Sequence, residues 1–147
     1  MVSSRPRRLS RQDKRVLGGF AAEHSCCWAC GIGDGELRAD GIEYPRRLVI
    51  HHIVKPGRVH QRWNLARLCS LCHDLAEGYR IVVVRGQRRQ ILPRLELGNV
   101  LWLKRRHDAE HYDRMALQRH TRAGRRLPRG KIPAGWFFQQ TGIAWSL

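Results

Sequence analysis

Hydrophobic residues follow two different rhythms in the middle of the chain. Residues 46–54, RRLVIHHIV, form a short run of aliphatic and β-branched residues between prolines, which predicts a β-strand. Residues 64–78, NLARLCSLCHDLAEG, place a leucine every three or four positions before a glycine, which is typical of a helix that ends at that glycine. Residues 55–63 are predicted to be a loop between these two elements.

The flanking segments predict further elements. Residues 16–25 favour a helical turn before the strand. Residues 79–93, YRIVVVRGQRRQILP, contain two strand-like runs around Arg85-Gly86-Gln87 and predict a β-hairpin. Residues 95–124 have a helical period that is expected to break near His107-Asp108.

These patterns predict one compact α+β domain, which suits a chain of 147 residues. We expect a flexible basic arm over residues 1–16 and a core over residues 17–80. A hairpin and helical extension over residues 81–122 should pack on that core, followed by a basic and apolar tail over residues 123–147. The aromatic end of the tail, GWFFQQTGIAWSL, either docks on a partner protein or folds back on the core.

Charge indicates the class of partner. The chain has 28 Lys and Arg against 12 Asp and Glu, a net charge of +16 and a pI of about 11.2. The expected partner is a polyanion, which could be DNA, RNA or an acidic membrane surface, and nucleic acid is favoured because arginine forks bind phosphate. No apolar run reaches the roughly 18 residues that span a membrane. The basic start also lacks the apolar segment of a secretory signal, so we expect a cytoplasmic protein that binds no membrane.

Four of the five cysteines occur as two C-x-x-C motifs, Cys27 with Cys30 and Cys69 with Cys72. A tight turn at this spacing aims both sulfurs at one ion, and two such turns complete a tetrahedral structural Zn²⁺ site. Two disulfides or simple buried cysteines are the alternatives. Cys26 could replace Cys27 as a ligand, but we interpret it as a spare thiol because Cys27 keeps the C-x-x-C spacing.

Histidines near these motifs suggest a second metal site. His51 and His52 are adjacent in the predicted strand and therefore point to opposite faces, so one could bind a metal while the other faces a substrate water. His73 and Glu77 are four residues apart and share a helical face. Such a set could hold a divalent ion with open positions, as a catalytic metal needs. The alternative for Glu77 is a solvated helix residue.

The segment LVIHHIVKPGRVHQRWNLARLCSLCHDLAEG, framed by the paired C-x-x-C motifs, resembles the HNH endonuclease family, particularly its zinc-containing, free-standing phage-type nucleases. The matching features are a strand ending in His-His-Ile, a loop, Asn-Leu, and then Leu-Cys-x-x-Cys-His. The resemblance covers residues 27–78. It implies a ββα-metal (His-Me finger) core with a four-cysteine zinc site, and a metal-dependent DNA endonuclease that would act in the host cytoplasm if a phage encodes it.

Individual roles follow from the same resemblance. His51 and His73 would hold a catalytic divalent ion such as Mg²⁺ or Mn²⁺, with Glu77 as the additional ligand that some members carry. His52 would be the general base that takes a proton from the attacking water. Asn64 would brace the loop and orient the base, although in some members this residue binds metal. The expected products carry a 5′ phosphate and a 3′ hydroxyl.

The loop over residues 55–63 departs from the family pattern. It lacks the Gly-Gly often found there and contains His60, which we interpret as a surface histidine. Arg58, Arg62 and Arg67 flank the proposed site and either contact phosphate or only add surface charge. Two other functions stay open: a non-catalytic, zinc-dependent nucleic-acid-binding module and a phage packaging accessory.

Overall fold

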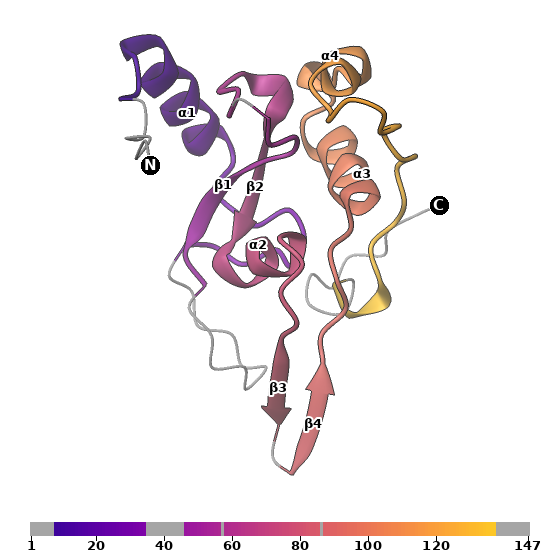
Figure 1. The fold of residues 1–147 in the computed structure, drawn as a ribbon. Helices are drawn as coiled ribbons and strands as arrows, with labels where there is room; N and C mark the ends of the chain where they lie inside the picture. Colours follow the sequence, from indigo (N-terminus) through magenta and orange to yellow (C-terminus); the bar gives the residue numbers. More distant parts are fainter. Residues whose placement is uncertain (1–7, 35–45, 57, 86, 138–147) are drawn as a thin grey trace, which may run out of the picture.

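The computed structural model describes residues 8–34, 46–56, 58–85 and 87–137. Two small antiparallel sheets and four helices make a mixed α+β fold (Figure 1). No helix in these ranges is long and apolar enough to cross a membrane. The strands are β1 (Leu48–His52), β2 (Leu65–Cys69), β3 (Val82–Arg85) and β4 (Arg88–Ile91). The helices are α1 (Arg11–Glu23), α2 (Ser70–Ala76), α3 (Leu97–His107) and α4 (Arg114–Arg119), with 3-10 turns η1 (Arg62–Asn64) and η2 (Ala109–His111).

The predicted helix over residues 64–78 is only half correct. Its first part is strand β2, which pairs antiparallel with β1 so that His51 lies opposite Ala66 and His52 opposite Leu65. Residues on both faces of β2 are buried, so its leucines carry no strand-like alternation. Helix α2 begins only at Ser70, where the Cys69 sulfur accepts a hydrogen bond from the Cys72 N–H.

The predicted basic arm over residues 1–16 is too long, because α1 begins at Arg11. Ser10 and Asp13 form a capping box, a local signal that starts a helix by satisfying its first free N–H groups. Phe20 is fully buried on the inner side of α1, with its ring centroid 5.7 Å from that of Trp28. The capping box starts the helix, and the Phe20 contact holds α1 on the core. Residues 1–7 of the predicted arm lie outside the described residues.

The hairpin and the helix break predicted in the second half of the chain are confirmed. Strands β3 and β4 form the expected hairpin, which projects from one end of the molecule (Figure 1). Helix α3 ends at His107, at the expected break, before η2 and α4. In the tail, Trp136 and Phe137 are buried in the same hydrophobic cluster as the cysteines, so this part folds back on the core. Residues 138–147 lie outside the described part.

Candidate active site

Four cysteines meet in the core between α1 and α2. Cys27, Cys30, Cys69 and Cys72 are buried, and their sulfurs all lie within 4.8 Å of one another. Two backbone N–H groups point at sulfurs, Cys30 at Cys27 and Cys72 at Cys69, each at 3.5 Å. The first knuckle is held against the sheet because the Trp28 N–H donates to the Arg67 carbonyl oxygen at 2.9 Å.

The sulfur spacing fits a metal better than a disulfide. The sulfurs of Cys30 and Cys69 are 3.7 Å apart. Two sulfurs in a disulfide lie about 2.05 Å apart, whereas two ligands of a tetrahedral zinc with Zn–S bonds of about 2.3 Å lie roughly 3.8 Å apart. Hydrogen bonds with Cys27 lower the pKa of the Cys69 thiol and raise that of the Cys72 thiol, so the four thiols interact closely. This group could therefore bind a structural zinc, and the exposed Cys26 stands outside it.

A second group of metal-binding side chains lies where α2 packs against β1. His51, His73 and Glu77 each offer a ligand atom within 4.8 Å of the others. The Glu77 Oε1 atom is 3.7 Å from His51 Nδ1 and 3.3 Å from His73 Nε2. The two imidazole rings meet edge to face with centroids 5.1 Å apart. Two elements that are distant in sequence thus direct imidazoles toward one carboxylate.

His51 could serve as a ligand in this group. Its Nδ1 atom is buried and has no hydrogen-bond partner, an arrangement that is costly unless something else occupies that lone pair. Burial is the main cause that lowers the pKa of His51 to about 3, and the positive charges of His73 and Lys55 act in the same direction. The imidazole is therefore neutral at pH 7, which is the form that ligates metals.

Glu77 is the only anionic member of the group. Its side chain is 24% exposed and contacts the Lys55 ammonium. The Lys55 ammonium balances the negative charge of Glu77, and a bound divalent ion would take over this role. Lys55 is itself 58% exposed, so its flexible side chain can turn to solvent without leaving a buried charge. The donor set of two imidazoles and one carboxylate suits several divalent metals.

His52 faces away from this group, toward the loop over residues 55–63. Its Nε2 atom is 3.0 Å from His60 Nδ1, so one imidazole donates a hydrogen bond to the other. Burial is the main cause that lowers the pKa of His52 to about 4, and His60 and nearby cations act in the same direction. His52 is thus neutral at pH 7 and is held in one orientation by His60, on the face of β1 opposite to His51. His60 is partly buried, which corrects its interpretation as a surface histidine.

Asn64 closes the loop between the two strands. The side chain is fully buried, and its Nδ2 atom donates to the carbonyl oxygens of Val54 and Val59 at 3.0 Å each. Its Oδ1 atom accepts a hydrogen bond from the Val54 N–H at 2.8 Å. All three bonds stay within the loop, so Asn64 fixes the path of the chain from His52 to His60.

Comparison with known proteins assigns no family to this chain, so the geometry of the site is the evidence for its function. The chain matches no protein-family model, no curated protein and no solved structure.

The three arginines singled out from the sequence have different surroundings. Arg62 pairs with Glu23 at 2.6 Å and lies 3.7 Å from the Asp108 carboxylate. The Arg67 Nε atom donates to the His24 carbonyl oxygen at 3.0 Å, and its side chain is half-buried. Arg58 is exposed at the start of the loop, with a φ angle of 42°. The guanidinium groups of Arg62 and Arg67 are therefore engaged inside the protein, which leaves Arg58 as the best placed of the three to contact phosphate.

Sequence patterns did not identify Lys55 and His60 as members of the site. Both lie in the loop over residues 55–63, where no regular period predicts side-chain direction. The sequence offers one indication of the His52–His60 contact. The two histidines are eight residues apart, and a loop of that length can fold back and bring them together.

Proposed function

We propose that this protein is a metal-dependent DNA endonuclease of the HNH type, with a ββα-metal core formed by β1, β2 and α2. The observation that carries the proposal is the convergence of His51, His73 and Glu77, together with a neutral His52 that follows His51 in β1 and is oriented by His60. The strand–strand–helix order and the four-cysteine frame around it support the same family. A net charge of +16 favours a polyanionic substrate.

The chain's own residues would divide the work of phosphodiester hydrolysis. A divalent ion held by His51, His73 and Glu77 would neutralise charge on the phosphate and on the leaving 3′ oxygen. His52 would take a proton from the attacking water as its oxygen bonds to phosphorus. The bond from phosphorus to the 3′ oxygen then breaks, and protonation of that oxygen leaves a 3′ hydroxyl and a 5′ phosphate. His60 would hold the His52 ring, and Asn64 would hold the loop that carries His60.

A plasmid-cleavage assay tests this proposal. Zinc-loaded protein is incubated with supercoiled plasmid in Mg²⁺ or Mn²⁺, and His52→Ala is compared with wild type. We expect wild type to nick or cut the plasmid and His52→Ala to be slower by roughly 100-fold or more, because general-base catalysis contributes about 10²–10⁴. EDTA at a level that leaves the zinc in place should stop wild-type cleavage. No cleavage by wild type in any divalent metal would reject the enzymatic function.

The second candidate is a zinc-dependent nucleic-acid-binding module without catalysis. It is favoured by the Lys55–Glu77 contact, which balances the Glu77 charge without a metal ion. This candidate predicts DNA binding that persists without divalent ions, no cleavage, and no effect of His52→Ala on either property. The plasmid assay therefore separates the two candidates.

A further inference from the structure

The C-terminal part of the chain is basic without any balancing acid. After Asp113 the sequence contains six arginines and one lysine and no Asp or Glu through residue 147. Arginines in this number do not form a solvated, mixed-sign surface, which would intersperse both charges. A surface built this way is expected to face a polyanion.

The turn after α4 is a rigid frame. The Thr121 hydroxyl donates to the Leu117 carbonyl oxygen at 2.6 Å. The Gln118 side chain donates to the Arg125 carbonyl oxygen at 3.1 Å and accepts from the Leu127 N–H at 2.8 Å. These bonds tie residues 121–127 back to the helix. The backbone that carries the side chains of this turn is therefore held in place, which reduces the backbone entropy lost when the turn binds a ligand.

The arginines on this frame fall into two groups. Arg114 donates to the carbonyl oxygens of Leu127 and Pro128, at 2.9 and 3.0 Å, so it belongs to the frame itself. Arg119, Arg122, Arg125 and Arg126 are exposed, and within the described part of the chain no carboxylate pairs with them. Their guanidinium groups are available to a ligand.

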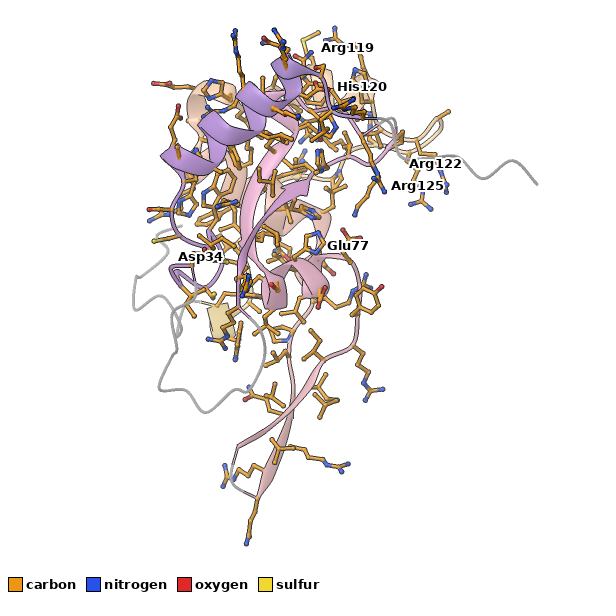
Figure 2. The ribbon with its side chains drawn as sticks, turned by 90° about the vertical axis from the view of Figure 1, so that its left-hand side faces the viewer. Asp34, Glu77, Arg119, His120, Arg122 and Arg125 are labelled. Carbon is orange, nitrogen blue, oxygen red and sulfur yellow. The ribbon has the colours of Figure 1, made fainter. Side chains whose placement is uncertain are left out.

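The turn is attached to the loop of the candidate active site. The His120 ring, at the end of α4, packs on the Trp63 ring with centroids 5.0 Å apart. Trp63 lies in η1 next to Asn64, which fixes the loop that carries His60. Figure 2 shows Arg122 and Arg125 on the same side of the molecule as Glu77.

We propose that residues 119–125 form a phosphate-binding surface that grips the DNA backbone at a distance from the metal group and so positions the duplex for cleavage. This inference rests on the proposed function, because it makes the turn part of the same substrate site. The segment QRHTRAGRR, residues 118–126, contains no large apolar side chain. It therefore lacks the apolar centre that a protein interface needs, whereas exposed arginine forks suit phosphate oxygens.

The test compares two variants with the same change in charge. Arg122→Gln/Arg125→Gln removes two arginines from the turn. Arg88→Gln/Arg89→Gln removes two exposed arginines from β4, in the hairpin at the opposite end of the molecule (Figure 1). Binding of a fluorescein-labelled duplex of about 30 base pairs to zinc-loaded protein is measured by anisotropy at several salt concentrations, without added divalent ions.

We expect Arg122→Gln/Arg125→Gln to bind roughly tenfold more weakly at about 0.1 M salt. The slope of log K against log[salt] should decrease in magnitude by about 2, because each contacted phosphate contributes about 0.9 to that slope. The hairpin variant should change both quantities by less than half as much. Equal losses in the two variants, or an unchanged slope in the turn variant, would overturn the proposal.

The binding assay tests the phosphate-binding surface, and the cleavage assay tests the endonuclease. A weaker, less salt-dependent turn variant supports the surface even if wild type fails to cut plasmid in any metal, the result that rejects the endonuclease. If wild type cuts plasmid while the turn variant binds as tightly as wild type, the endonuclease stands and the surface is rejected.

Discussion

At the scale of single residues, the decisive feature is a lone pair without a partner. The Nδ1 atom of His51 is buried and has no hydrogen-bond partner, while a carboxylate and a second imidazole lie within 4.8 Å. Several buried side-chain nitrogens of the described residues lack a hydrogen-bond partner, and His51 Nδ1 is the one that also belongs to a group able to hold a metal ion. The adjacent His52 has a different partner, His60, because neighbouring residues of a strand point to opposite faces.

Two acidic residues of the α2 region provide a matched comparison. Glu77→Gln removes the only carboxylate of the His51–His73–Glu77 group, whereas Asp74→Asn makes the same change in charge at a carboxylate that lies 3.8 Å from His73 Nδ1 but is not one of the clustered ligands. We expect Glu77→Gln to weaken Mn²⁺ binding by roughly 10- to 100-fold, because a neutral amide is a poorer ligand for a hard cation. Isothermal titration of zinc-loaded protein measures this. Equal affinities for Mn²⁺ in the two variants would remove Glu77 from the ligand set.

His60 should act as a positioning residue for His52. His60→Ala removes the hydrogen bond to His52 Nε2, so the His52 ring loses its fixed orientation. We expect the cleavage rate at saturating DNA to fall roughly 10- to 100-fold, as small misplacements of a reacting group do. Affinity for Mn²⁺ should not change, and His60→Gln should recover part of the rate. Loss of Mn²⁺ binding in His60→Ala would instead place His60 among the ligands.

At the scale of elements, the sequence predicted local structure well where one local rule applied. The strand β1, the β3–β4 hairpin and the break after α3 all follow from short-range patterns. The strand β2 did not, because burial on both of its faces allows leucines at 65 and 68. Their spacing continues into Leu71 and Leu75 of α2, so the whole run imitates one helix across the strand–helix junction. That burial comes from packing by distant segments, which no local period records.

The candidate site could be predicted to a similar extent. The ligand types and their elements could be inferred, because C-x-x-C and i, i+4 spacing have direct geometric meaning. The surroundings of Arg62 could not be inferred, because Glu23 and Asp108, which it faces, are far away in sequence. The His52–His60 contact depends on the course of a loop, which only the folded chain defines.

Lys104 joins α3 to the site loop. Its fully buried ammonium donates to the carbonyl oxygens of Arg62 and Leu65, at 2.6 and 2.9 Å, and to the Asp108 carboxylate at 2.6 Å. Lys104→Met would leave a buried carboxylate and two carbonyl oxygens without this donor. We expect a loss of about 3 kcal/mol in the free energy of unfolding, as when one partner of a buried ion pair is removed.

Urea unfolding of the zinc-loaded protein measures the loss. The control is Arg105→Met, the next residue on α3, which is exposed and should change the stability by less than about 0.5 kcal/mol. If Lys104→Met were as stable as the control, the buried ammonium would not be holding α3 to the loop.

At the scale of the whole molecule, the cysteine group connects the parts that carry the site. It lies in the same hydrophobic cluster as Phe20 of α1, Leu101 of α3 and Phe137 near the C-terminus. A zinc ion held there would contribute its binding free energy to folding, because the ligands come together only in the folded chain. The strongly basic surface adds little to that stability and instead determines the partner.

Cysteine substitutions test this frame. Cys30→Ser should lower the zinc content from one ion per chain toward none and reduce the melting temperature by more than about 10 °C, because the loss of a ligand removes folding free energy. Cys26→Ser, next to the first knuckle but exposed and outside the group, should keep its zinc. Elemental analysis and thermal melts measure both. Zinc loss in Cys26→Ser with retention in Cys30→Ser would require a different ligand set.

The most direct test of the second metal site is anomalous diffraction from crystals of the zinc-loaded protein soaked in Mn²⁺. We predict a manganese peak bounded by His51, His73 and Glu77, with the Lys55 side chain displaced, and a separate zinc peak among the four cysteines. A zinc peak at the cysteines without manganese density at the histidines would contradict the account, because His52 would then have no metal ion beside it.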